Sequence, residues 1–263
     1  MLASRRFLRI GNAPSIKTPL LLPSFSSKGF PNVAKILKTM EEYISEEVLV
    51  SAYDIHYGHI TPPFDFASVI FLDSGGYESS KEIELSDTYE TDYSGKEWSV
   101  GKYQKVLSEW KSILPTVCVS YDHPNGRIAT KDQIARAKAT LLPPGNSARA
   151  LLIKPETDGS KRLHLDDILP NVKQMTGFAV IGVTEKEIGN STLSRMINVA
   201  KLRKELDAHH PIILAFQFTC LEASIQFQLF YTFSQVQTYS TASLGYVTRF
   251  QTATLSIGTT LGH

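Results

Sequence analysis

Short apolar runs alternate with segments of helical periodicity along most of the chain. The strand-like runs are residues 18–25, 47–53, 67–72, 116–121, 148–153, 178–183 and 211–216. The segments with apolar positions three and four residues apart are residues 32–45, 99–113, 131–141, 165–175 and 191–206. Strands that alternate with helices predict an α/β fold with a parallel sheet, either closed or open.

The number of predicted strands limits the choice of architecture. A length of 263 residues is close to that of eight βα units. Seven strands are counted, the last of them at residues 211–216 where the composition changes, so the pattern favours a (β/α)8, TIM-barrel-like fold that is incomplete at its C-terminal end. We assign residues 1–210 to this α/β-barrel domain and treat residues 211–263 separately.

Two predictions concern individual helices. Thr130 precedes the helical segment 131–141, and its hydroxyl is of the kind that caps a helix N-terminus. The helix at 191–206 is amphipathic, and we expect its inward face to consist of Leu193, Met196, Ile197, Ala200 and Leu202.

The last 53 residues differ from the rest of the chain. From Pro211 onward the only acidic or basic side chains are Glu222 and Arg249, whereas Gln, Ser, Thr and aromatic residues dominate. A barrel helix needs a charged outer face, and this segment offers none. The tail is either a set of buried or paired strands or the product of a shifted reading frame, and we favour the second interpretation.

Charge and cysteine content narrow the class of protein. The net charge of +1 gives no overall attraction to nucleic acid or membrane, so binding to a polyanion would need a local basic patch. Cys118 and Cys220 are far apart in apolar runs, which predicts free thiols in a reducing compartment. Without a CxxC pair no zinc site is expected. We expect a cytoplasmic protein with no membrane span and no signal peptide.

The sharpest local motif is Asp73-Ser74-Gly75-Gly76-Tyr77, which follows an apolar strand. At the carboxyl-terminal end of a barrel strand, Asp73 would point at a ligand. Paired glycines let backbone amides approach a flat substrate, and Tyr77 could stack on its ring. An ordinary Asp-Ser-Gly-Gly turn explains the same residues, and local chemistry does not choose between the two.

These residues resemble the DSGG(F/Y)Q motif of the tRNA-guanine (queuine) transglycosylase superfamily, with Glu78 in place of the glutamine. The resemblance implies an α/β-barrel enzyme that exchanges guanine in a nucleic acid for a 7-deazaguanine. It gives Asp73 the role of acid and base toward the exchanged base. Ser74, Gly75 and Gly76 would contact that base, and Tyr77 would pack on its ring.

Three other segments are similar to the family in the expected order. The segment Thr18-Pro19-Leu20-Leu21-Leu22-Pro23 is similar to its first strand. The strand that ends at Asp122 is similar to one whose aspartate holds the Watson–Crick edge of a guanine-like base, and a carboxylate suits the N1–H and amine of guanine. The segment 177–183 is similar to a strand whose backbone contacts the base at the positions of Gly182 and Val183.

The sequence also departs from the family. His123 replaces a glutamate, and Lys154-Pro155 stands where the family has a glutamine-glycine pair that reads the base. These two departures suggest that the chain resembles a divergent branch of the family, such as the enzymes that insert 7-deazaguanines into DNA. The family's attacking aspartate, which forms a covalent glycosyl-enzyme, and its zinc site follow the last strands. No aspartate follows Asp207, so this chain is expected to lack the nucleophile and to hold no metal or other cofactor.

Three functions therefore remain open. The first is base exchange on tRNA or DNA with a 7-deazaguanine as the incoming base. The second is a non-catalytic paralogue or partner subunit that binds a nucleobase or nucleic acid, in a homodimer or heterodimer. The third is a barrel glycoside hydrolase that uses Asp73 and Asp122 as its carboxylate pair.

Other polar groups are weaker candidates. His56 and His59 could line the rim and hold a metal together with Asp54, although loop histidines without a metal are the simpler interpretation. The acidic segment 82–92 is expected to be a solvated insertion, with a role as a lid over the substrate as the alternative.

Overall fold

The structure is a computed structural model. It describes residues 6–20, 22–28, 30, 32–44, 46–80, 95–122, 127–156, 161–209, 213–217 and 227–228.

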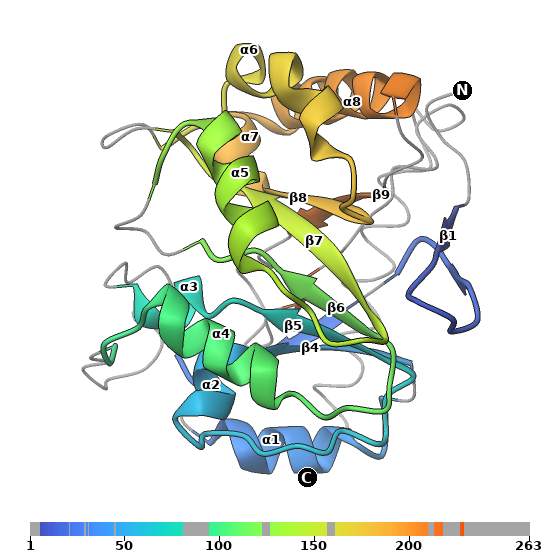
Figure 1. The fold of residues 1–263 in the computed structure, drawn as a ribbon, viewed down its shortest axis with the longest axis vertical. Coiled ribbons are helices and arrows are strands. Elements are labelled where there is room, and N and C mark those ends of the chain that lie inside the picture. The colour runs from blue at the N-terminus through green and yellow to red at the C-terminus, as the bar shows by residue number, and fades with distance from the viewer. Residues whose placement is uncertain are drawn as a thin grey trace, which may run out of the picture.

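A curled, mainly parallel sheet is the centre of the fold (Figure 1). Its strands lie in the order β10-β3-β4-β5-β6-β7-β8-β9, and every pair from β3 to β9 is parallel. The strands are β3 (Leu22–Phe25), β4 (Glu47–Ser51), β5 (Val69–Asp73), β6 (Thr116–Val119), β7 (Ser147–Ile153), β8 (Val180–Thr184), β9 (Ile213–Gln217) and β10 (Phe227–Gln228). Consecutive strands are neighbours, as in a half-barrel, which confirms the predicted mixed α/β class with a parallel sheet.

Alternation along the strands divides the core into two layers. On the concave side, Leu22, Leu49, Phe71 and Val117 belong to one buried cluster. The intervening residues, such as Val48, Ile70 and Cys118, belong to a larger cluster that also contains the helices. Because both faces are covered by apolar side chains, the strands read as nearly continuous hydrophobic runs in the sequence.

The concave cluster is closed at the amino-terminal edge of the sheet by a short antiparallel ribbon. Its strands are β1 (Phe7–Leu8) and β2 (Ile16–Lys17). Leu8 and Ile10 are fully buried in the same cluster as the sheet. The turn at Gly11 lies against Asn146, immediately before β7 begins, which places the ribbon at the amino ends of the strands.

Helices cover the convex face of the sheet (Figure 1). They are α1 (Val33–Met40), α2 (Ala52–His56), α3 (Gly76–Ser79), α4 (Val100–Glu109), α5 (Thr130–Thr140), α6 (Leu165–Ile168), the 3-10 helix η3 (Leu169–Met175), α7 (Glu185–Ile188) and α8 (Thr192–His209). The predicted helix at 165–175 is divided because Pro170 cannot supply the N–H that an α-helical turn would use.

The predicted cap of α5 is wrong. Thr130 is already the first helical residue, and the capping position is Ala129, whose own side chain makes no capping hydrogen bond. Instead, the Glu156 carboxylate accepts a hydrogen bond of 2.6 Å from the Thr130 N–H. A carboxylate from a neighbouring loop therefore satisfies the first turn of the helix.

The predicted inward face of α8 is also largely wrong. Leu193, Met196 and Ile197 are exposed, by 67%, 36% and 45%. Leu202 is buried as predicted, together with Val199 and Leu206. These buried residues are three and four positions apart, so they form a different side of α8, and that side packs into the larger core cluster.

The predictions for the C-terminal tail lie mostly outside the described residues. Within 211–263 the structure describes only β9, which extends the parallel sheet, and β10, which pairs antiparallel with β3. The acidic segment 82–92 and Cys220 are also outside the described residues, whereas Cys118 is a buried free thiol. Among the described helices, none has the length and apolar character needed to cross a membrane.

Candidate functional site

Asp73 is the last residue of β5, at the carboxyl-terminal edge of the sheet. It pairs in register with Ser51 at the end of β4. It also has the same strand parity as Phe71, whose side chain belongs to the concave cluster. The Asp73 side chain is partly exposed, and its Oδ2 accepts a 3.1 Å hydrogen bond from the Gly75 N–H. The strand thus delivers a carboxylate to the carboxyl-terminal edge of the half-barrel, as predicted from the sequence.

Asp122 lies beside this motif, three residues after the end of β6. Its Oδ1 accepts a short hydrogen bond from the Ser74 hydroxyl. A Cβ atom added at Gly76 would overlap the Asp122 carboxylate, so the glycine leaves the space that Asp122 occupies. The structure therefore brings Asp122 together with Ser74 and Gly76, which the sequence had predicted for one site.

The environment of Asp73 disfavours its ionised form. Burial among the strand ends, the Asp122 carboxylate and the Glu78 carboxylate together raise the pKa of Asp73 well above its ordinary value. The Gly75 N–H and the Lys154 ammonium act in the opposite direction but do not cancel the rise. A carboxyl group that stays protonated near neutral pH can give a proton to a reacting atom.

Two further carboxylates were not predicted as part of this site. Glu78 is buried and accepts a 2.9 Å hydrogen bond from the Ser51 hydroxyl. Asp54 is fully buried and accepts a 2.8 Å hydrogen bond from the Ser27 N–H, together with a short one from the Ser27 hydroxyl. Burial is the main cause that raises the pKa of each group. Ser27 follows β3 and Ser51 ends β4. These two serines were the sequence signal that could have indicated this network.

Lys154 follows β7 and brings a positive charge to the carboxylates. Its Nζ is 4.0 Å from Asp122 Oδ2 and 3.4 Å from Glu187 Oε2, and it donates a 3.0 Å hydrogen bond to Thr184 Oγ1. Burial lowers the pKa of Lys154, but Glu187 and Asp122 outweigh burial and raise the pKa above its ordinary value. Lys154 is therefore a charged member of the site.

Tyr77 and Lys28 form a second contact at the rim. The Lys28 Nζ lies 4.4 Å from the centre of the Tyr77 ring, a cation–π geometry. The same ammonium donates hydrogen bonds to the Tyr77 carbonyl at 2.9 Å and to the Ser80 carbonyl at 2.8 Å. Lys28 thus binds the end of α3 and occupies the space over the Tyr77 ring, the ring that was predicted to stack on a base.

The remaining predicted site residues are backbone positions. Gly75 has a φ of 84°, the left-handed conformation that glycine adopts without a steric cost. Gly182 and Val183 lie inside β8 and pair with strands on both sides. A Cβ at Gly182 would approach Leu152 Cδ1 to 3.1 Å, whereas the Val183 side chain is buried with the helices. Their predicted contact with a base stays a prediction.

The two candidate histidines belong to an aromatic cluster. His56 packs edge-on against Trp98 with 5.4 Å between ring centres, and His59 stacks on Tyr53 at 6.4 Å. Asp54, the carboxylate considered with them, is bound by Ser27. Within the described part of the chain, no group of three or more His, Cys, Asp or Glu residues has a metal-binding arrangement.

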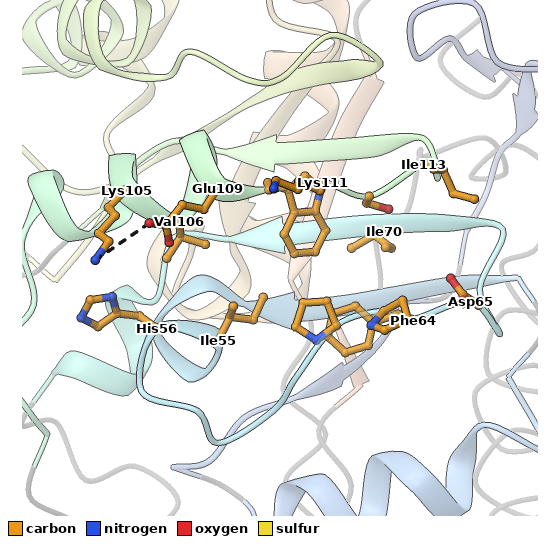
Figure 2. Close-up of a pocket in the computed structure, with 14 residues that line it drawn as sticks. Ile55, His56, Phe64, Asp65, Ile70, Lys105, Val106, Glu109, Lys111 and Ile113 are labelled. Atoms are coloured by element: carbon orange, nitrogen blue, oxygen red, sulfur yellow. Dashed lines mark ion pairs between the residues drawn. The ribbon is translucent and has the colours of Figure 1, made fainter.

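A cavity of about 570 Å³ lies elsewhere in the fold, on the convex side between α2, the loop 62–65 and α4. Figure 2 shows its side chains, which include apolar groups from Ile55, Phe64 and Ile70 and the ion pair of Lys105 with Glu109. The candidate histidine His56 lines this cavity, whereas none of the residues predicted to bind or react with the base does. It is therefore separate from the carboxylates at the strand ends.

Comparisons with models of known protein families, with curated proteins and with solved structures found no match for this chain.

Proposed function

We propose that this chain binds a guanine-like base at the carboxyl-terminal edge of its sheet, as the base-binding part of a transglycosylase that exchanges guanine in tRNA or DNA for a 7-deazaguanine. The observation that carries the proposal is the pair of carboxylates, Asp73 and Asp122, on neighbouring strands with different surroundings. Burial and the neighbouring carboxylates raise the pKa of Asp73 well above its ordinary value, whereas Asp122 lies beside the Lys154 ammonium.

In this proposal Asp122 accepts hydrogen bonds from the N1–H and the exocyclic amine of the base. Asp73 gives its proton to the base as its bond to the sugar breaks, and takes a proton from the incoming base in the reverse step. Gly75 and Gly76 keep the turn free of side chains where the flat base would approach. A protonated acid next to a bound carboxylate is the arrangement that such paired acid and base roles require.

The attack on the sugar carbon is not assigned to a residue of this chain. The family resemblance places the attacking aspartate after the last strands, and no aspartate follows Asp207. We therefore expect binding of the base by this polypeptide with little exchange. This lack favours the second candidate, a non-catalytic nucleobase- or nucleic-acid-binding paralogue or partner subunit.

Isothermal titration calorimetry with guanine and 7-deazaguanine tests the proposal. We expect both bases to bind, and Asp122→Asn to weaken binding at least about tenfold because the amide offers a donor where an acceptor is needed. Asp65→Asn, an exposed acidic residue at the other cavity, is the matched control and is expected to bind normally.

Exchange of labelled guanine into tRNA and into DNA separates the candidates. Binding without exchange supports the non-catalytic function, and exchange abolished by Asp73→Asn supports the enzyme. Absence of binding to every purine would overturn both. Cleavage of an aryl glycoside in that case would favour the glycoside hydrolase.

A further inference from the structure

Lys154 is held at the end of β7 by contacts that leave part of its ammonium group available. An ammonium has three N–H donors. One is directed to Thr184 Oγ1 at 3.0 Å and a second to Glu187 Oε2 at 3.4 Å. Its side chain is 17% exposed, so water reaches only part of it.

The third donor faces Asp122. The distance from Lys154 Nζ to Asp122 Oδ2 is 4.0 Å, which is an ion pair but too long for a direct hydrogen bond. Asp122 Oδ1 is engaged by the Ser74 hydroxyl, while Oδ2 has only the distant ammonium among its contacts with the described residues. One N–H of the Lys154 ammonium and the Oδ2 atom of Asp122 thus lie side by side, and neither has a direct hydrogen-bond partner among the described residues.

The backbone of Lys154 is fixed by Gln133. The Lys154 N–H donates to Gln133 Oε1 at 3.0 Å, and Gln133 Nε2 donates to the Lys154 carbonyl at 2.8 Å. Gln133 is itself buried in α5. Gln133 fixes the main chain of Lys154, and Thr184 and Glu187 hold its ammonium, so the donor is in place before any ligand arrives and the entropic cost of recognition is lower.

We propose that Lys154 and Asp122 together select bases that carry a carbonyl oxygen next to a ring N–H, so that Lys154 determines the specificity of this site. The inference rests on the proposed function. The ammonium donates to the carbonyl oxygen at position 6 of the purine, and the carboxylate accepts from the adjacent N1–H and the amine. Lysine contacts the same oxygen of guanine in nucleic acids. Adenine offers an amine at this position and no proton on N1, so it satisfies fewer of these groups.

A comparison of guanine with 6-thioguanine isolates the part that Lys154 plays. The thio analogue keeps the N1–H and the amine but replaces the carbonyl oxygen with sulfur, a weaker acceptor. We expect the unmodified protein to bind guanine about tenfold more tightly than 6-thioguanine. In Lys154→Met this preference is expected to fall to about twofold or less, whereas Lys154→Arg keeps a donor and retains most of it.

Lys105→Met is the matched control, because Lys105 also pairs with a carboxylate, Glu109 at 3.9 Å, but lies at the other cavity. It is expected to keep the full preference. Unchanged selectivity in a folded Lys154→Met would overturn the role of Lys154 while leaving the proposed function intact. Equal affinity of the unmodified protein for guanine and 6-thioguanine would also overturn the role of Lys154. If no purine binds at all, both proposals fail.

Discussion

The two edges of the sheet are built from different kinds of residue. The amino-terminal edge is closed by apolar side chains, with Leu8 and Ile10 buried against the concave cluster. The carboxyl-terminal edge concentrates ionisable groups, with Asp73, Asp122 and Lys154 within one network. The amino-terminal edge lowers the free energy of the folded chain because it removes apolar surface from water. The carboxyl-terminal edge raises that free energy because it removes charged groups from water.

This difference matters because a buried charge destabilises the folded state unless an opposite charge or a hydrogen bond compensates it. At the carboxyl-terminal edge the carboxylates are satisfied by serine hydroxyls, backbone N–H groups and one lysine. Burial nevertheless raises the pKa values of Asp73, Glu78 and Asp54, which reduces stability at higher pH. The comparison therefore predicts that substitutions at the amino-terminal edge change stability without changing base binding, whereas substitutions at the carboxyl-terminal edge change both.

The largest effect is expected from Gly75→Ala at the carboxyl-terminal edge. The backbone φ of 84° is unfavourable for alanine, and the new Cβ would come within 2.5 Å of Tyr53 Cβ and 3.0 Å of its backbone nitrogen. Strain and overpacking together should lower the free energy of unfolding by about 4 kcal/mol. Urea denaturation measures this change.

Gly58→Ala is the control, since its φ of 70° is also positive but nothing lies within 4 Å of the added Cβ. It is expected to cost only about 1 kcal/mol. Equal losses in the two variants would mean that the close packing of Gly75 on Tyr53 has no energetic importance.

Leu8→Ala tests the closure of the amino-terminal edge. Leu8 is fully buried, so its truncation should lower the free energy of unfolding by about 3 kcal/mol, at every pH and without changing the preference for guanine. Phe7→Ala alters the preceding residue, which is 56% exposed, and should cost less than about 1 kcal/mol. A change in base selectivity caused by Leu8→Ala would contradict the separation of the two edges.

Glu47→Gln is expected to have a smaller effect that depends on pH. Glu47 begins β4 at the amino-terminal edge, and burial, assisted by Glu46, raises its pKa from 4.5 to about 7. Because the pKa is raised in the folded state, the stability present below pH 4.5 is lost as the pH rises toward and through 7. The substitution should therefore stabilise the protein by about 2 kcal/mol at pH 8 and hardly at all at pH 4.

Thermal or urea unfolding across this pH range provides the measurement, with Glu42→Gln as the exposed control. A gain at pH 4 equal to that at pH 8 would show that burial of the charge is not the cause. The pH dependence that remains in Glu47→Gln is assigned to the carboxylates of the other edge, where Glu78 also has a raised pKa.

The smallest effect is expected from Lys105→Met on the convex side. Its pair with Glu109 has a long distance of 3.9 Å, and the two side chains are 63% and 66% exposed. Such pairs contribute little, so the free energy of unfolding should change by less than about 0.5 kcal/mol. A loss above about 1 kcal/mol would indicate that the cavity beside it depends on this lysine for its structure.

Much of the arrangement of the site followed from the strand pattern. Asp73 and Asp122 each come after an apolar run, and the carboxyl ends of parallel neighbouring strands share an edge. Their proximity could therefore be predicted without coordinates. Lys154 follows the next strand in the same way, but its pairing with Asp122 and Glu187 could not be predicted, because it depends on rotamers and on where α7 lies.

Other features were decided by packing between elements. The apolar positions of α8 are compatible with more than one inward face, and packing into the larger core cluster selected the stripe of Val199, Leu202 and Leu206. Glu78 was noted only as a substitution in a motif, yet it is buried and accepts a hydrogen bond from Ser51 at the end of β4. The lysine over Tyr77 comes from a segment 49 residues earlier in the chain, which no local pattern connects to it.

The sequence by itself determined the alternation of strands and helices, the parallel order of the sheet, and the strand ends that carry Asp73 and Asp122. These depend on short-range periodicity, which each segment carries independently. The tertiary structure decided which charges meet, which helix face is buried, and how far each carboxyl group is removed from water. Those properties depend on distances between segments far apart in the chain, and they set the chemistry that the site can perform.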